Sequence, residues 1–202
     1  MKNTYHIPRK SEKDSHEVKK STFISYLFHA PHMNDVSSHL QALKQKHPKA
    51  RHICWACIAG DPADTSVRGF SDDGEPSGCA GKPLLKVLAY SGLGETALFV
   101  VRYFGGIKLG TGGMVKAYTT AAQRVISLCS TEKIVPTISG EITIPYRMEP
   151  LLRYILQDPA ITHTEFQYSE AVRVHLSLEE TSFQRISERI RTECNCTISP
   201  DP

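Results

Sequence analysis

The sequence predicts a two-domain protein of the α+β class, and its length, charge distribution and residue pattern all support this. A chain of 202 residues is long for one domain but sufficient for two small ones. Residues 1–134 carry 18 Lys and Arg against 11 Asp and Glu, whereas residues 135–202 carry 6 against 10. The spacing of apolar residues changes at the same point, from long elements to short regular units. We therefore expect one domain over 1–134 and another over 135–202.

The first domain is predicted to combine buried strands with amphipathic helices. Apolar runs predict strands at 20–29, 52–59, 67–70 and 96–104. A first helix is expected to follow Asn34 as its N-cap and to stop at Pro48. A second helix should begin near Pro83 and end at Gly92, and a third places its apolar face between 115 and 129.

The second domain is predicted to follow a linker over 130–136. Short elements then alternate, with strands expected at 140–146, 162–168, 172–178 and 197–198 and helices around 151–156 and 183–190. The two middle strands are joined by a tight connection at 169–170. The order β-α-β-β-α-β in such a short segment is typical of ferredoxin-like domains.

The composition predicts a globular protein of the cytoplasm with no membrane segment. Hydrophobic residues make up 40% of the chain, which is enough for a packed core. The longest apolar run, Ala97–Val101, is far shorter than a membrane span, and the first residues show no apolar secretory segment. Six cysteines in such a chain are expected to be reduced. Cys54 and Cys57 should point to opposite faces of one strand, so we expect buried thiols rather than a metal or redox pair.

The segment 100–118 carries the densest functional signal. Five glycines fall within nine residues between a predicted strand and a predicted helix: Gly105, Gly106, Gly110, Gly112 and Gly113. Backbone N–H groups in such a loop, next to a helix N-terminus, form a concavity that binds anions. Three cations lie within this segment, namely Arg102, Lys108 and Lys116, and Lys82 of the preceding predicted helix is a fourth candidate binding residue. The alternative is purely architectural, with glycines that only permit an unusual turn.

An acidic loop over 71–81 contains Asp72, Asp73 and Glu75. These carboxylates could hold a hard cation or accept protons, but an Asp-Gly turn explains them equally well and is the interpretation we favour. The spacing of Gly106 and Gly110 does not match a Walker loop, and no nucleophile elbow is present. We predict no catalytic residue, no metal and no cofactor.

Two long blocks of sequence resemble the signature of the IMPACT family. They are Ser71-Asp-Asp-Gly-Glu-Pro-Ser-Gly-Cys-Ala-Gly-Lys-Pro83 and Val101-Arg-Tyr-Phe-Gly-Gly-Ile-Lys-Leu-Gly-Thr-Gly-Gly113. The resemblance covers about residues 18–130 and implies a bacterial two-domain member. It implies an N-terminal domain of the ribosomal protein S5 domain 2-like fold and a C-terminal domain similar to the last domain of elongation factor G. Eukaryotic members regulate translation by competing for a partner that activates a kinase of an initiation factor, a mechanism not expected here.

Three functions remain open from the sequence. The first is a non-enzymatic, translation-linked binding protein that contacts RNA or a ribosome-associated partner through its basic glycine-rich surface. The second is a phosphate- or nucleotide-binding enzyme that uses the Gly105–Gly113 loop, and the third is an adaptor that binds only proteins. The excess of positive charge in residues 1–134 favours the first. The sequence leaves the oligomeric state open.

Overall fold

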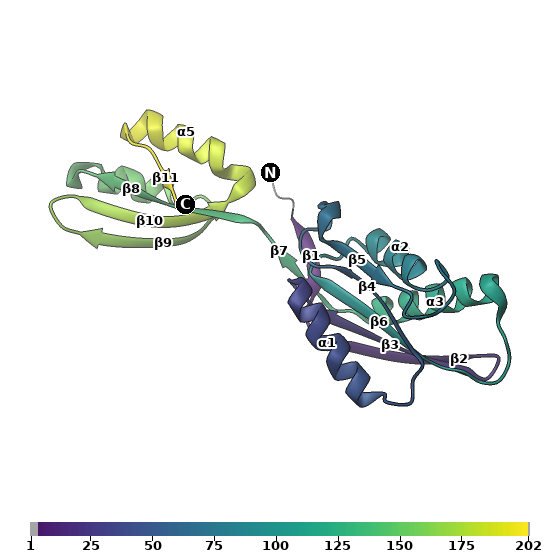
Figure 1. The fold of residues 1–202 in the computed structure, drawn as a ribbon. Helices are drawn as coiled ribbons and strands as arrows, with labels where there is room; N and C mark the ends of the chain where they lie inside the picture. The colour runs from purple at the N-terminus through teal and green to yellow at the C-terminus, as the bar shows by residue number, and fades with distance from the viewer. Residues whose placement is uncertain (1–3, 202) are drawn as a thin grey trace. The chain divides into compact units, whose positions relative to one another are not determined.

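The computed structural model describes residues 4–201 and separates the chain into two compact units (Figure 1). The N-terminal unit is Tyr5–Ile134, and the C-terminal unit contains the residues from Val135 onward. Both combine helices with antiparallel sheets, so the α+β class predicted from the sequence is confirmed. Of the helices in the described residues, none is both long and apolar enough to cross a bilayer.

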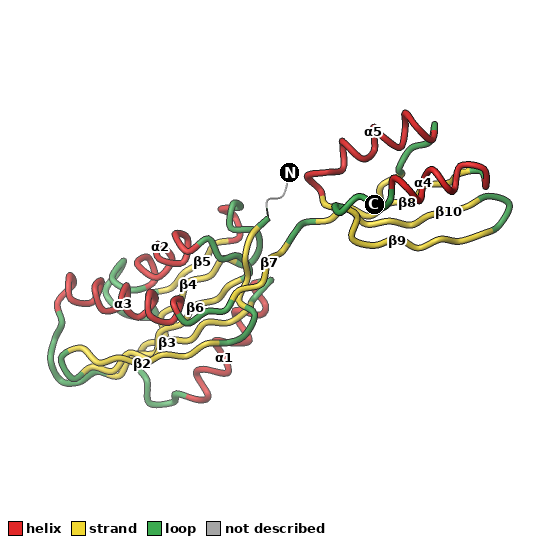
Figure 2. The backbone as a smooth tube through the Cα atoms, turned by 180° about the vertical axis from the view of Figure 1, so that it is seen from behind, coloured by secondary structure: helices red, strands yellow, loops and turns green. Residues whose placement is uncertain are grey.

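A five-stranded antiparallel sheet in the order β2-β3-β6-β4-β5 forms the centre of the N-terminal unit. Its strands are β2 (Glu12–Val18), β3 (Ser21–His29), β4 (His52–Ile58), β5 (Arg68–Ser71) and β6 (Thr96–Tyr103). Helices α2 (Gly81–Ser91) and α3 (Gly110–Ser127) pack on one face, and α1 (Met33–Lys46) packs on the other (Figure 1, Figure 2). A separate two-stranded sheet pairs β1 (Tyr5–Pro8) with β7 (Thr131–Ile134).

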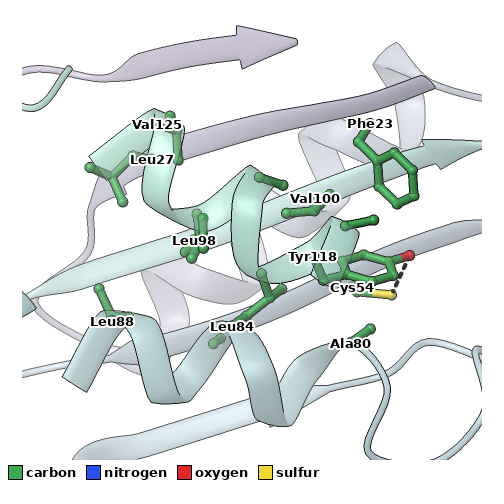
Figure 3. Packing of buried hydrophobic residues seen from close by; sticks show 14 of the residues in the cluster. Phe23, Leu27, Cys54, Ala80, Leu84, Leu88, Leu98, Val100, Tyr118 and Val125 are labelled. Atoms are coloured by element: carbon green, nitrogen blue, oxygen red, sulfur yellow. Dashed lines mark hydrogen bonds between the residues drawn. The ribbon is translucent and has the colours of Figure 1, made fainter. Parts of the chain in front are cut away.

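The central strands of this sheet are buried on both faces. Leu98 and Val100 of β6 pack under α2 and α3, whereas Phe99 and Val101 pack under α1. Phe23 of β3 joins the α2–α3 side, as Figure 3 shows. Burial on both faces explains why the sequence carries continuous apolar runs here instead of a polar alternation.

The two cysteines of β4 lie on opposite faces of the sheet, as their spacing predicts. Cys54 belongs to the cluster under α2 and α3, and Cys57 belongs to the cluster under α1. Both thiols are free. Burial raises the pKa of Cys54 to about 12 and that of Cys57 to about 11, so both stay protonated near neutral pH. They are packing residues and not a redox pair.

The C-terminal unit has the ferredoxin-like order predicted from the sequence. Strands β8 (Thr137–Ile144), β9 (Ile161–Tyr168), β10 (Val172–Glu179) and β11 (Ser199–Pro200) alternate with helices α4 (Glu149–Ile155) and α5 (Phe183–Cys194). The sheet order is β11-β8-β10-β9, and every neighbouring pair is antiparallel. The helices supply Leu152, Ile155, Ile186 and Ile190 to a core with the inward residues of β8 and β10.

Several elements differ from the sequence prediction. The segment 130–136, expected to be only a linker, contains β7, and strands β1 and β2 were not predicted. Helix α1 begins at Met33 with His32 as its N-cap, rather than after Asn34. The reason is local, since the Asp35 carboxylate accepts a hydrogen bond of 2.9 Å from the His32 N–H and so fixes the earlier start.

Candidate functional site

A cavity of about 470 Å³ lies in the N-terminal unit beside the first turn of α3. We call it the α3 cavity. The start of β4, the end of β6 and the acidic segment also contribute to its walls. Its lining residues are Arg51, His52, Glu75, Pro76, Arg102, Phe104, Lys108, Leu109, Gly110, Thr111 and Met114. The cavity therefore joins the two segments that carry the densest sequence signals.

The acidic segment forms a tight turn at the edge of the α3 cavity. The Glu75 N–H donates to the Asp72 carbonyl at 2.9 Å, and the two central residues have positive φ, +42° at Asp73 and +83° at Gly74. Two successive positive φ values define a type I′ turn, for which Asp-Gly is a preferred pair. The turn interpretation favoured from the sequence therefore describes this segment.

The carboxylates of Asp72 and Asp73 hold the turn against the rest of the unit. Asp72 accepts hydrogen bonds from the backbone N–H groups of Gly78, Ala80 and Gly81 at 2.8 to 2.9 Å. Burial acts to raise the pKa of Asp72, but these three donors outweigh it and the pKa lies below its ordinary value. Asp73 accepts from the Ile53 N–H at 2.7 Å. Both side chains are thus used as structural acceptors.

Glu75 is the third carboxylate, and it lies inside the unit, 8% exposed. Its Oε1 atom accepts hydrogen bonds from Arg102 Nη1 at 2.7 Å and from the Tyr118 hydroxyl at 2.8 Å. The Tyr118 hydroxyl also lies 3.4 Å from Cys54 Sγ, as Figure 3 shows. Burial, followed by the neighbouring Cys54 and Glu75, raises the pKa of Tyr118 far above its ordinary value, so it remains a neutral donor.

Arg102 occupies a different position from the surface site expected from the sequence. It is 7% exposed and forms the floor of the α3 cavity, because Glu75 pairs with its guanidinium from inside the unit. Its Nη1 atom also contacts Met114 Sδ at 3.5 Å. Its Nε atom is buried and has no hydrogen-bond partner among the described residues. Arg102 therefore keeps unused donor capacity next to the cavity.

The glycines of the segment 105–113 do not share one role. A Cβ atom at Gly105 would overlap the backbone of Lys20 and Ser21, and the Gly105 N–H donates to Ser21 Oγ at 3.1 Å. Gly105 therefore serves architecture, in line with the alternative left open by the sequence. Gly106 and Gly110 instead have positive φ, +85° and +72°, with open space where a Cβ would lie.

The expected glycine loop is shorter than predicted, because α3 already begins at Gly110. Gly112 and Gly113 therefore belong to the first turn of a helix of 18 residues. The first N–H groups of any helix lack intrahelical acceptors and carry the positive end of the helix dipole. Gly110 and Gly112 are exposed, with open space where a Cβ would lie, and Gly110 lines the α3 cavity.

The four predicted cations are not gathered at one site. Lys108 lines the α3 cavity together with Arg102. Lys116 lies on another side of α3, in a depression with Lys19 and Gly113, and Lys82 lies in a groove between α2 and α3. The site therefore contains two of the four.

Arg51 and Phe104 line the α3 cavity but were missed from the sequence. Strands β4 and β6 are antiparallel, with His52 paired to Arg102. This register brings Arg51, which precedes His52, and Phe104, which follows the end of β6, to the same end of the sheet. An antiparallel pairing of the two predicted strands would therefore have indicated that these two residues lie close together. His52 also lines the cavity and donates from Nδ1 to the Asp73 carbonyl at 2.7 Å.

The comparisons with known proteins agree with the resemblance found in the sequence. A model of the Impact N-terminal domain matches residues 19–126, more than half of the chain. An IMPACT family member of Haemophilus influenzae is 37% identical over 186 residues, which cover 92% of this chain and 90% of that protein. The IMPACT family member YigZ of Escherichia coli is 40% identical over 162 residues, with 79% of each protein covered.

A solved structure gives the same result in three dimensions. It is described as that of an hypothetical protein, and it matches the whole chain and 98% of its own length with a TM-score of 0.70 at 32% sequence identity. The similarity thus extends over both units and not only over the glycine-rich segment. The chain belongs to the IMPACT family, and over most of its length it is similar to YigZ.

Proposed function

We propose that this protein is a non-enzymatic, translation-linked regulator whose N-terminal unit binds RNA or a ribosome-associated partner through the α3 cavity and its basic rim. The translation link rests on what the family resemblance implies. The contact surface is argued from the geometry of the cavity.

The observation that carries the proposal is the convergence of positive charge at the α3 cavity. Arg51 and Lys108 are exposed on its rim, and Arg102 lies at its floor. The amides of the first turn of α3 add a partial positive charge that does not depend on side chains. The single carboxylate in the lining, Glu75, pairs with Arg102 and neutralises it, so Arg51 and Lys108 supply the net positive charge of the cavity. A phosphate group is the ligand that such an arrangement favours.

The enzyme alternative receives less support from the same residues. A metal-assisted reaction would need free carboxylates, yet Asp72, Asp73 and Glu75 each accept hydrogen bonds from protein groups. Across residues 4–201, no cluster of three His, Cys, Asp or Glu side chains is arranged to hold a metal ion. The cavity can bind an anion with the groups that it has.

The C-terminal unit is a weaker candidate for the RNA contact. Its charge is negative, with 6 Lys and Arg against 10 Asp and Glu over residues 135–202. The face of β10 that lies away from the helices carries Arg173, His175 and Ser177, with no Phe, Tyr or Trp on that strand face for base stacking. We assign the RNA contact to the N-terminal unit.

The test measures binding of the full chain to short fluorescent RNAs by anisotropy over a range of salt concentrations. Binding should weaken steeply as salt rises, because phosphate contacts release counterions. Lys108→Glu should weaken binding and reduce the salt slope by about one or more. Lys44→Glu, at an exposed position of α1 on the other face of the sheet, is the matched control and should bind normally. Equal binding by both variants, or no binding at low salt, would contradict the proposal.

A further inference from the structure

We infer that the α3 cavity receives one unstacked nucleotide of single-stranded RNA, with its phosphate at the start of α3 and its base against Phe104. This inference rests on the proposed function and deepens it. The proposed function requires only that the basic rim contacts a polyanion. The inference adds that the cavity selects an unpaired strand and excludes a continuous duplex.

The phosphate position follows from two independent features. The first turn of α3 contributes Gly110 and Thr111 to the cavity wall, and Gly110 has open space where a Cβ would lie. The first N–H groups of a helix lack intrahelical acceptors, so a phosphate at this turn can accept from them. The second feature is Arg102, which lines the cavity through the 8% of its side chain that remains exposed. A guanidinium carries five N–H donors, and the contacts to Glu75 and Met114 both come from Nη1. A phosphate oxygen is the acceptor that the accessible part of this group favours.

The base position follows from the apolar part of the lining. Phe104 is 52% exposed although it directly follows β6, a strand that is buried except for its last residue, Tyr103. The Arg102 guanidinium carbon lies 5.7 Å from the centre of its ring, so the two sides of the proposed site are in contact. Leu109, Met114 and Pro76 continue the apolar wall. A planar base stacked on an exposed aromatic ring, next to a bound phosphate, fits this combination.

The concave shape decides between single-stranded and duplex RNA. In an A-form duplex the bases are stacked inside the helix, so a protein contacts its phosphates and hydroxyl groups along a convex surface. Neither Phe104 nor the floor of the cavity would touch such a surface. In a single strand, a base can turn out of the stack and enter a cavity of about 470 Å³, which lies within the range of ordinary ligand sites.

The experiment compares two RNAs of equal length, one unstructured and one base-paired, on the full chain at low salt. The unstructured RNA should bind more tightly. Phe104→Ala should weaken its binding by about tenfold, as expected for the loss of one stacking platform, and should leave duplex binding unchanged. The control is Tyr90→Ala, which removes an aromatic side chain that is 83% exposed on α2 and outside the cavity. Circular dichroism of both variants verifies that they are folded.

The outcomes separate the inference from the proposed function. Preference for the unstructured RNA, lost in Phe104→Ala and kept in Tyr90→Ala, would support the inference. Equal binding of both RNAs with no effect of Phe104→Ala would overturn the inference and leave the proposed polyanion contact standing. Absence of binding to either RNA would overturn the inference and the RNA contact of the proposed function, and would favour an acidic protein as the partner.

Discussion

The N-terminal and C-terminal units use charged residues in opposite ways. In the N-terminal unit, Arg102 and Glu75 pair at 2.7 Å with side chains that are 8% and 4% exposed. In the C-terminal unit, Arg185 and Asp158 pair at the same distance, but their side chains are 58% and 11% exposed. The first pair lies at the floor of a cavity, whereas the second links α5 to the surface segment after α4. The two pairs have the same chemistry in different environments.

The buried pair of the N-terminal unit carries an energetic cost of desolvation that packing alone does not explain. Two apolar residues of similar volume often stabilise an interior as well as a buried ion pair does. A buried pair beside a cavity therefore indicates a use for its charge. An exposed pair carries no such indication, because it costs little to form and contributes little.

The largest expected effect comes from breaking the buried pair. Glu75→Gln leaves Arg102 as an uncompensated buried cation, and we expect the free energy of unfolding to fall by about 3 to 5 kcal/mol. Urea unfolding followed by Trp55 fluorescence measures this loss. Trp55 is the single tryptophan of the chain and lies in β4, so its signal reports on the N-terminal unit.

Two further variants test whether the loss of stability in Glu75→Gln comes from the uncompensated charge of Arg102. Arg185→Met breaks the exposed pair of the C-terminal unit and should leave the Trp55 transition unchanged. The double variant Glu75→Gln with Arg102→Met removes the buried charge and should recover much of the lost stability. It should bind RNA more weakly than the natural protein, because the cavity has lost the Arg102 guanidinium. A change below about 1 kcal/mol in Glu75→Gln would mean that the pair is not buried in solution.

The next largest effect separates two glycines of the same segment. Gly105→Ala should reduce the free energy of unfolding by about 3 kcal/mol, because its Cβ would overlap the backbone between β2 and β3. Gly112→Ala has open space in the first turn of α3 and should stabilise the helix by up to about 1 kcal/mol. Urea unfolding of both variants checks this. Equal changes in the free energy of unfolding would show that the two glycines do not differ in their tolerance of a side chain, contrary to this prediction.

The strands with continuous apolar runs were the easiest to predict from the sequence, and the polar edge strands were the hardest. Strands β4 and β6 are buried on both faces, so their residues leave no other interpretation. Strand β2 is paired only with β3, and its sequence Glu-Lys-Asp-Ser-His-Glu-Val lacks an apolar alternation. Strands β1 and β7 are four residues each and stabilise one another, which no local pattern reveals.

The site was predictable by segment but not by residue. Both sequence blocks do meet at the α3 cavity. The sequence could not show that Glu75 neutralises Arg102, because 27 positions separate them and only the fold brings them together. The sequence also could not distinguish the role of Gly105 from that of Gly112. Only Gly105 lies against the backbone of the turn between β2 and β3, which is distant in the sequence. Local chemistry was predictable, whereas tertiary proximity was not.

A smaller effect concerns the acid stability of the N-terminal unit. The pKa of Asp72 is lowered in the folded state, so its contribution is complete above the ordinary value of 3.8 and is lost as the pH falls through the folded value. Asp72→Asn should reduce the free energy of unfolding by about 1 to 2 kcal/mol at neutral pH and flatten its decline below pH ~4. Unfolding curves read from Trp55 between pH 3 and 7 measure both.

The matched variant for acid stability lies in the other unit. The pKa of Asp158 is lowered to about 2, chiefly by its hydrogen bonds to Arg185. Asp158→Asn should therefore flatten the decline in stability of the C-terminal unit as the pH falls, and it should leave the Trp55 transition unchanged. Far-ultraviolet circular dichroism measures the first effect. If the stability of Asp72→Asn declined with pH as that of the natural protein does, the charge of the Asp72 carboxylate would not contribute to the acid dependence of the N-terminal unit.

The smallest expected effect is a decline in the stability of the N-terminal unit between pH 7 and 5. His47 lies between the hydroxyl groups of Tyr26 and Tyr103, at 2.8 and 2.9 Å. Burial, with Lys46 and Lys13 nearby, lowers its pKa below the ordinary value of 6.5. The unfolded chain therefore binds this proton first as the pH falls, so stability is complete above 6.5 and decreases below it.

His47→Gln should make the unfolding midpoint, read from Trp55, less sensitive to this change of pH. Some sensitivity should remain, because burial also lowers the pKa of His16, which stacks on Phe23 in the same unit. Identical pH dependence in the two proteins would assign the whole effect to His16 or to groups outside the interior. A larger decline in the variant would show that protonated His47 is stabilised by its two tyrosines, contrary to the environment described for it.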